Sequence, residues 1–234
     1  MVIRAIDRPP DTPHAANDEF DSPTLDAIWT VVQGTAGTVD LAGATGGIYD
    51  LTSRPGWLLM QAGTNQHVRL RQDYTLGDGE SVIACIAIAL QAAGEPGITD
   101  SYLDCGIAVS NRTDDWHAGD YATVHLDSEV GAWRIFGGGG LNGVANPAVS
   151  VPGANVSFPH IAQRFYFRIL RDGLDYYTMW SADGATWFPF VKATLPQAAT
   201  SIWLFAQVDD PVPTPLPIQA FDWVRIGGSG VDPW

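Results

Sequence analysis

Apolar and polar residues alternate with a period of two in short runs along most of this 234-residue chain, and Gly, Pro, Asn or Asp separates one run from the next. Such alternation is typical of β-strands, whose side chains point to opposite faces in turn. Helical spacing is weak, because Gly and Pro interrupt nearly every window long enough for a helix. The pattern therefore predicts an all-β chain with these strands: Ile28–Val32, Gly47–Leu51, Trp57–Gln61, Val68–Tyr74, Ser81–Gln91, Leu103–Asn111, Tyr121–Asp127, Ala132–Phe136, Phe165–Arg171, Tyr176–Ser181, Thr186–Val191 and Ile202–Gln207.

Two similar segments stand at the ends of this regular part, Asp18–Val32 and Gln219–Gly228. Each contains a Phe-Asp pair that precedes an apolar stretch with a Trp. We expect them to form the first and last strands of one closed unit. The sequence thus predicts a single β-sandwich domain over residues 18–228, preceded by an irregular Pro-containing arm, 1–17, and followed by a short tail, 229–234.

Glycine marks three further features of the second half of the chain. Asp172-Gly173 predicts a tight hairpin, because Asp-Gly supplies the positive φ angles that two-residue turns need. Ser181–Trp187 resembles a contracted Asp-box, and we interpret it as a structural turn. The Gly-rich stretch Phe136–Asn142 lacks the Lys-Ser/Thr pair of a phosphate-binding P-loop, so a mobile loop is expected there.

The two cysteines, Cys85 and Cys105, are expected to stay apart. In their predicted strands Cys85 alternates on the face with the small residues, whereas Cys105 shares the face with the bulky ones. Unless a bulge changes this parity, the thiols point in opposite directions even if their strands are neighbours. The sequence therefore predicts no disulfide.

Charge and hydropathy exclude some partners. The formal net charge is −14, with only 12 Lys plus Arg, which argues against a nucleic-acid-binding surface. No apolar run approaches the roughly 20 residues that span a bilayer, and the N-terminal residues lack the apolar core of a signal peptide. We expect no nucleic-acid partner and no membrane insertion. The expected localisation is a virion that assembles in the host cytoplasm.

Several of these segments together resemble the concanavalin A-like lectin/glucanase superfamily, in particular the sandwich domains appended to family 43 glycosidases. The resemblance implies a two-sheet antiparallel jelly roll with its first and last strands adjacent. It also implies one concave face of the kind often used for sugars. The segments that carry it are Asp18–Asp21, Leu25, Trp29, Tyr176-Tyr177, Ser181–Trp187 and Phe221–Ile226.

Two known catalytic motifs are missing, one of this superfamily and one of hydrolases with another fold. No segment matches the Glu-x-Asp-x-x-Glu strand of the glucanases, and no Gly-x-Ser-x-Gly elbow occurs. The five histidines have no telling spacing, and His125 is interpreted as an ordinary residue of a sheet surface. We therefore expect no enzyme and no cofactor, with calcium held by dispersed loop acids left open.

The best candidate for ligand binding lies between two predicted strands, in the polar and aromatic segment 111–121. Sugar rings stack on flat aromatic side chains, and their hydroxyls need planar polar partners. Trp116 could stand in solvent beside such groups, or it could cap the end of the sandwich; both interpretations remain. The candidate glycan-binding residues are Asn111, Arg112, Asp114, Trp116 and Tyr121.

These observations favour a non-catalytic recognition or assembly module. One hypothesis is a virion structural protein of a bacteriophage: a capsid decoration, tail or fibre component. It would contact neighbouring protein subunits through the N-terminal arm and could also bind cell-surface glycans. The alternative is a free-standing carbohydrate-binding module of a bacterial polysaccharide-processing system, and a glycoside hydrolase is the third hypothesis.

Overall fold

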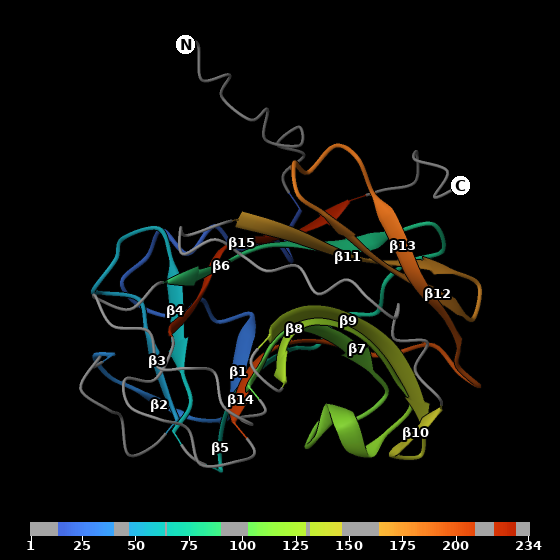
Figure 1. The fold of residues 1–234 in the computed structure, drawn as a ribbon, viewed down its shortest axis with the longest axis horizontal. Helices are drawn as coiled ribbons and strands as arrows, with labels where there is room; N and C mark the ends of the chain where they lie inside the picture. Colours follow the sequence, from blue (N-terminus) through green and yellow to red (C-terminus); the bar gives the residue numbers. More distant parts are fainter. Residues whose placement is uncertain are drawn as a thin grey trace.

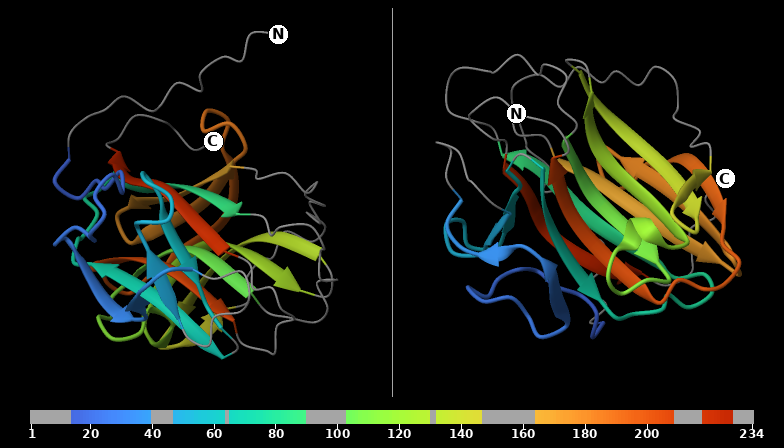
Figure 2. Two further views of the ribbon diagram at one scale, coloured as in Figure 1. Left: turned by 90° about the vertical axis from the view of Figure 1, so that its left-hand side faces the viewer. Right: turned by 90° about the horizontal axis from the view of Figure 1, so that it is seen from below.

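The computed structural model describes most of the chain, and the statements below concern those residues. They are 14–39, 47–63, 65–89, 103–129, 132–146, 164–208 and 218–227. Figures 1 and 2 show them as two stacked β-sheets. No α-helix occurs in these ranges, and none of their helical turns is long and apolar enough to cross a membrane.

The first sheet has seven strands and the second has eight, and every pairing is antiparallel except that of β2 with β3. The predicted all-β, two-sheet jelly-roll sandwich is therefore confirmed. In spatial order the seven-stranded sheet contains β1 (Trp29–Gln33), β5 (Gln66–Gln72), β14 (Ser201–Val208), β7 (Leu103–Ser110), β8 (Tyr121–Glu129), β9 (Ala132–Leu141) and β10 (Val144–Asn146). The eight-stranded sheet contains β13 (Phe188–Thr194), β12 (Asp175–Ser181), β11 (Arg164–Asp172), β6 (Ser81–Ala89), β15 (Ile218–Gly227), β4 (Leu58–Gln61), β3 (Ile48–Asp50) and β2 (Thr35–Ala36).

The core lies between the two sheets, because alternate residues of each strand point inward. Leu204 and Val124 enter it from the seven-stranded sheet, and Phe167, Ile86 and Val224 enter it from the other sheet. Each such buried side chain contributes about 1.5–3 kcal/mol relative to an exposed one. The remaining alternate residues of the seven-stranded sheet point away from this core, and they build the candidate site described below.

The matched ends of the chain meet, but not as adjacent strands. β1 pairs with β5 in the seven-stranded sheet, whereas β15 lies between β6 and β4 in the other sheet, so the expected adjacency of first and last strands is wrong. Instead Asp18 forms an isolated bridge with Val224 on β15. The carboxylate of Glu19 accepts two hydrogen bonds from Arg225, at 2.7 and 2.9 Å. The contact between the two end segments is therefore made by Asp18 and Glu19, which precede β1, and by β15.

The Gly-rich stretch is a strand rather than a loop, which corrects the expected mobile loop. β9 continues to Leu141 and turns back into β10, a strand that the sequence did not predict. A Cβ added at Gly140 would lie 2.4 Å from Cε1 of Tyr121, and one at Gly139 would lie 2.6 Å from Cβ of Ala193. Glycine is required here because both faces of β9 are packed too closely for a side chain.

The other local predictions agree with the structure. Asp172 pairs with Asp175 across a two-residue turn in which Gly173 has φ +61°, as the hairpin prediction requires. In the Asp-box-like turn, Oδ1 of Asp183 accepts the amides of Ala185 and Thr186 at 2.9 and 2.8 Å. Both cysteines are buried free thiols, as predicted.

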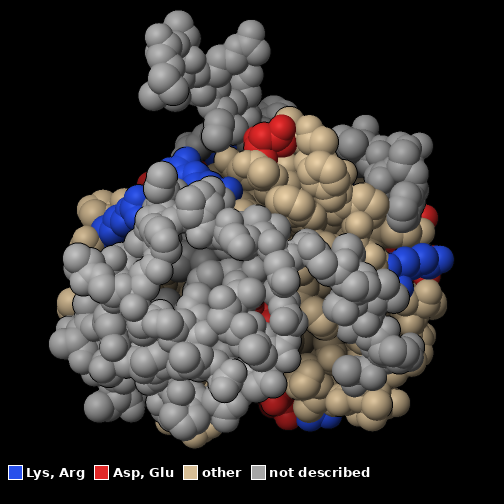
Figure 3. Space-filling view, in the orientation of Figure 1, with Lys and Arg blue, Asp and Glu red and all other residues tan. Residues whose placement is uncertain are grey.

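The arm and the tail, residues 1–17 and 229–234, lie mostly outside the described residues. The last four residues of the arm are described, and they rest on the sandwich. Ala16 is buried, its carbonyl accepts a hydrogen bond from Gln72, and Oδ1 of Asn17 accepts the amide of Ile226. On the face in Figure 3, the acidic and basic side chains of the described surface are scattered rather than gathered in one patch.

Candidate functional site

The candidate site is the outer face of the seven-stranded sheet. β7, β8 and β9 curve strongly, and the 3-10 turn η1 (Trp116–Ala118) lies on the concave side of that curve, away from the other sheet (Figure 1). Residues that alternate with the core residues of these strands point to this side. We call it the concave face.

Strand register aligns four polar side chains in one line across the concave face. Gln207 of β14 lies opposite His67 of β5 on one side and Asp104 of β7 on the other. Asp104 in turn lies opposite Asp127 of β8. All four residues are half-buried, so the line of side chains lies partly open to solvent. We call His67, Gln207, Asp104 and Asp127 the polar row.

Asp104 contacts two neighbouring side chains. Its Oδ2 accepts a hydrogen bond from Nε2 of Gln207 at 2.9 Å, and its Oδ1 lies 3.8 Å from Nε2 of His125. The Gln207 amide thereby orients the Asp104 carboxylate at the surface. Carboxylates and amides in such a line can accept and donate hydrogen bonds to hydroxyl groups.

His125 lies behind the polar row and is buried, which corrects its interpretation as an ordinary surface residue. It is 8% exposed, and its ring packs 4.9 Å from that of Phe136 and 5.7 Å from that of Phe205. Opposite it on β7 is Gly106, where a Cβ would lie 2.4 Å from Cβ of His125. Burial disfavours the charged imidazole and lowers the pKa of His125 to about 4, so the ring is neutral at pH 7.

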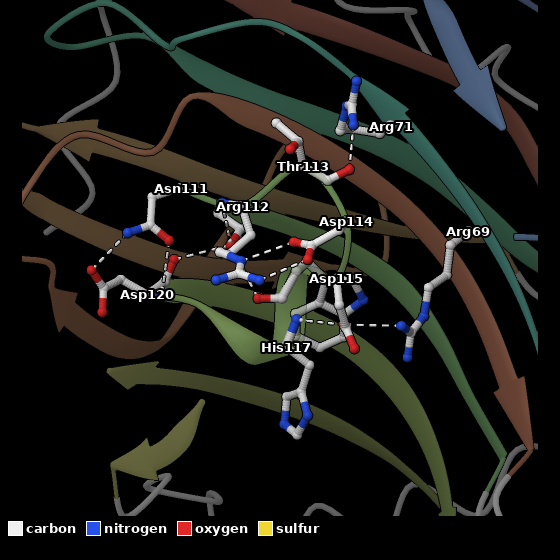
Figure 4. A network of polar contacts seen from close by, with 11 residues as sticks. Arg69, Arg71, Asn111, Arg112, Thr113, Asp114, Asp115, His117 and Asp120 are labelled. Carbon is white, nitrogen blue, oxygen red and sulfur yellow. Dashed lines mark hydrogen bonds and ion pairs between the residues drawn. The ribbon is translucent and has the colours of Figure 1, made fainter. Parts of the chain in front are cut away.

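Loop 111–120 forms a rim at one end of the concave face, and its polar groups are largely bound to one another (Figure 4). Nδ2 of Asn111 donates to Asp120 at 2.8 Å, and Oδ1 of Asp120 accepts the amide of Asn142 at 2.9 Å. Arg112 makes a two-pronged pair with Asp114, at 2.8 and 2.7 Å, and both side chains are exposed. The Arg112 guanidinium lowers the pKa of Asp114 to about 2.

Trp116 does not stand in solvent, which decides between the two interpretations left open by the sequence. It is 3% exposed, because η1 folds its ring onto the concave face. There the ring centroid lies 4.7 Å from that of Phe205 and 5.0 Å, edge to face, from that of Tyr121. Trp116 therefore caps that end of the face, and it offers no open platform for a sugar ring.

The five residues predicted for glycan binding thus play two roles. Asn111, Trp116 and Tyr121 hold the rim together, whereas Arg112 and Asp114 face solvent on its outside. Arg69 of β5 ties the rim to the sheet, because its Nη1 lies 2.9 Å from Oδ1 of Asp115. Sequence reasoning missed the polar row, whose members share no motif and meet only through strand register.

Metal binding has no ready site in the described part of the chain. No group of three or more His, Cys, Asp or Glu side chains within it is placed to hold a metal ion. The polar row supplies two carboxylates and one imidazole, but these lie on three different strands, β5, β7 and β8.

Comparisons with known proteins find the same type of fold in solved structures of glycosidases. No protein-family model matches the sequence, and no curated protein matches it. Similar solved structures include a xylan β-1,4-xylosidase of Bacillus halodurans, with 15% identity, a TM-score of 0.55, and coverage of 94% of this chain and 40% of that one. A β-1,3-glucanase of Mycobacterium marinum has 14% identity, a TM-score of 0.56 and coverage of 93% and 100%.

A third similar structure, from work on endo-acting O-glycanases of the human gut microbiota that initiate mucin breakdown, has 13% identity and a TM-score of 0.59. It covers 92% of this chain and 98% of that one. The chain spans about two fifths of the length of the family 43 glycoside hydrolase structures it matches. At these identities the likeness establishes the fold, and the predicted resemblance to sandwich glycosidases is confirmed at that level.

These similarities correct the expectation that the chain is not an enzyme. The fold is shared over 93% of this chain with a β-1,3-glucanase, so the missing Glu-x-Asp-x-x-Glu motif does not exclude catalysis. That motif requires its acids on one strand, whereas strand pairing here brings Asp104 and Asp127 together from two strands. The similarities give no support to a virion or bacteriophage protein, which remains a prediction from the sequence.

Proposed function

We propose that this chain binds a carbohydrate chain on its concave face and acts as the sandwich domain of a polysaccharide-processing protein. The observation that carries the proposal is the polar row, four half-exposed polar side chains from four adjacent strands. Neighbouring strands are about 4.8 Å apart, so the row extends over roughly 14 Å. That length suits an extended ligand with a hydroxyl group at every step.

The chemistry of the row fits sugar hydroxyls better than a charged or apolar ligand. Asp104 and Asp127 are acidic and would repel anions, while their oxygens can accept hydrogen bonds from hydroxyl groups. Phe136, half-buried next to His125, adds an aromatic edge that the C–H face of a sugar ring can contact. Buried Phe205 and His125 support the row from behind and keep it rigid.

Titration calorimetry with neutral oligosaccharides tests the proposal. The panel would contain xylan, β-1,3-glucan and mucin O-glycan fragments, the substrate classes of the structurally similar enzymes. Asp104→Asn and Gln207→Ala are expected to weaken binding at least about tenfold, because each removes an oriented hydrogen-bonding group. Asp114→Asn at the rim is the matched control and should leave the affinity unchanged.

Two results would overturn this assignment. One is the absence of any binding across the panel at millimolar sugar. The other is a loss of binding in Asp114→Asn with full binding in Asp104→Asn, which would move the site to the rim.

The same mixtures also report on hydrolysis. Glycosidases use a pair of carboxylates about 5–10 Å apart, and directly opposed positions of neighbouring strands fall near the lower end of that range. Release of new reducing ends that is lost in both Asp104→Asn and Asp127→Asn would make the concave face catalytic. Binding without such release would make it a carbohydrate-binding module.

A further inference from the structure

A second polar feature lies on the opposite side of the molecule, on the outer face of the eight-stranded sheet. Phe167 and Ile169 of β11 point into the core, so Arg168 between them points to this outer face. Its cross-strand neighbours are Met179 of β12 and Ile83 of β6. Arg168 is therefore a charged residue between two apolar ones.

Arg168 is buried and has no acidic partner among the described residues. It is 4% exposed, and its Nε has no hydrogen-bond partner. Three arginines are buried among the described residues, and the other two each have a carboxylate: Arg69 pairs with Asp115 and Arg225 with Glu19. None of the ion pairs among those residues involves Arg168.

Aromatic rings form the surroundings of this guanidinium. Its Cζ lies 5.7 Å from the centre of the Trp187 ring, which is half-exposed. Tyr166 is two residues away on the same face of β11. The Asp-box-like turn packs on the Tyr166 ring: a Cβ added at Gly184 would lie 3.3 Å from Cε1 of Tyr166. The turn thus carries Trp187 back over the outer face beside Arg168.

A buried guanidinium that lacks an anion is destabilising unless a ligand supplies one. A cation–π contact with Trp187 compensates only part of the lost hydration. Burial also lowers the pKa of Arg168. A planar guanidinium takes a carboxylate with two parallel hydrogen bonds, and a half-exposed Trp ring accepts the C–H face of a sugar.

We propose that Arg168 and Trp187 form a second binding site, which takes the carboxylate of a uronic acid residue in an acidic polysaccharide. The choice of a sugar as the carrier of the carboxylate rests on the proposed carbohydrate function. The site is separate from the concave face, which belongs to the other sheet.

The test compares trigalacturonate with its methyl ester, which has the same rings without the charges. Binding is followed by calorimetry and by Trp fluorescence. Wild type is expected to bind the acid at least about tenfold more tightly than the ester, because a charge-assisted pair is lost in the ester. Arg168→Met should abolish this preference. Arg168→Lys should keep only part of it, because a lysine ammonium cannot make the two parallel hydrogen bonds of a guanidinium. Arg54→Met removes an exposed Arg that stacks at 4.0 Å on Trp57, and it is the matched control with unchanged binding.

A stability measurement separates a binding role from a structural one. Without its ligand, Arg168→Met should unfold at the same or a higher temperature than wild type, because it removes an uncompensated buried charge. Arg225→Met, which leaves Glu19 unpaired, should unfold at a lower temperature. A clear loss of stability in Arg168→Met would show that Arg168 supports the fold.

Other outcomes overturn the proposal directly. One is equal affinity of wild type for acid and ester, and another is an undiminished preference in Arg168→Met. A poly-glutamate peptide that binds wild type but not Arg168→Met, while trigalacturonate does not bind, would make the occupant an acidic protein segment. Neutral oligosaccharides should bind Arg168→Met as they bind wild type, so a failure of the concave-face proposal is seen separately.

Discussion

The neutral state of His125 makes the stability of the protein depend on pH. Its pKa is about 4 in the fold, below the value of about 6.5 in an unfolded chain, so the unfolded state binds the extra proton. The resulting stabilisation is present above pH 6.5 and is lost as the pH falls towards 4. At 1.36 kcal/mol per pH unit the total reaches about 3 kcal/mol, of which about 1 kcal/mol is lost between pH 7 and 5.5.

Urea unfolding of wild type and His125→Gln at pH 7 and 5.5 checks this prediction. The drop in unfolding free energy should be about 1 kcal/mol larger in wild type, because glutamine does not titrate. Carboxylates with pKa values near 4 change little in this range and affect both proteins alike. Equal drops in the two proteins would mean that His125 is protonated in the fold.

Single residues were the hardest to predict from the sequence. His125 alternates correctly within a strand, but its burial depends on rings from β9 and β14, which pairing brings close. The sequence predicts the loop that contains Trp116. The exposure of Trp116, however, depends on a three-residue 3-10 turn that no sequence pattern predicts. Arg168 has unremarkable strand neighbours, and its lack of a partner is a property of the folded sheet alone.

At the scale of elements, β9 should tolerate no side chain at its glycines. Gly140→Ala and Gly139→Ala each force a Cβ into a contact of 2.4 or 2.6 Å, so each should lower the unfolding free energy by about 1–3 kcal/mol. Gly227→Ala on β15 is the control, since its Cβ would meet Oγ of Ser81 at an ordinary 3.6 Å. It should be neutral or slightly stabilising, because alanine reduces the entropy of the unfolded chain. Urea unfolding measures all three, and wild-type stability of Gly140→Ala would show that β9 is not packed against Tyr121.

Strand positions followed from the alternation of residues, whereas strand order did not. The alternation depends only on which residues face the core, so it located most strands within one or two residues. The order β5-β14-β7 brings together segments far apart in the chain, and each such pairing is decided by long-range packing. The second half of β9 could not be predicted, because a run of glycines is typical of a loop. Here the glycines are needed because both faces of the strand pack closely against other residues.

At the scale of the molecule, the fold class was predictable because many strands with turn signals between them allow few other architectures. The concave face was expected from the resemblance to a family, but its residues were not. The four residues of the polar row, at positions 67, 104, 127 and 207, are far apart in the sequence. They become neighbours only when their strands pair in the folded sheet. A site built by register across four strands leaves no local motif.

The segments at the two ends of the domain contact each other through the ion pair of Glu19 and Arg225. Substitutions in this pair measure how much the contact contributes to stability. Arg225 is buried, whereas the side chain of Glu19 is 30% exposed, so the pair is only partly shielded from water. Glu19→Gln should lower the unfolding free energy by about 1–3 kcal/mol, less than for a fully buried pair, because it leaves the guanidinium without its counter-charge. Arg225→Met should also destabilise, but the double variant should be more stable than the sum of the two losses implies, since neither charge is then left alone. Denaturant unfolding of the four proteins gives the coupling energy directly. Strict additivity would mean that the ends are joined by the Asp18 bridge and the buried apolar residues rather than by this pair.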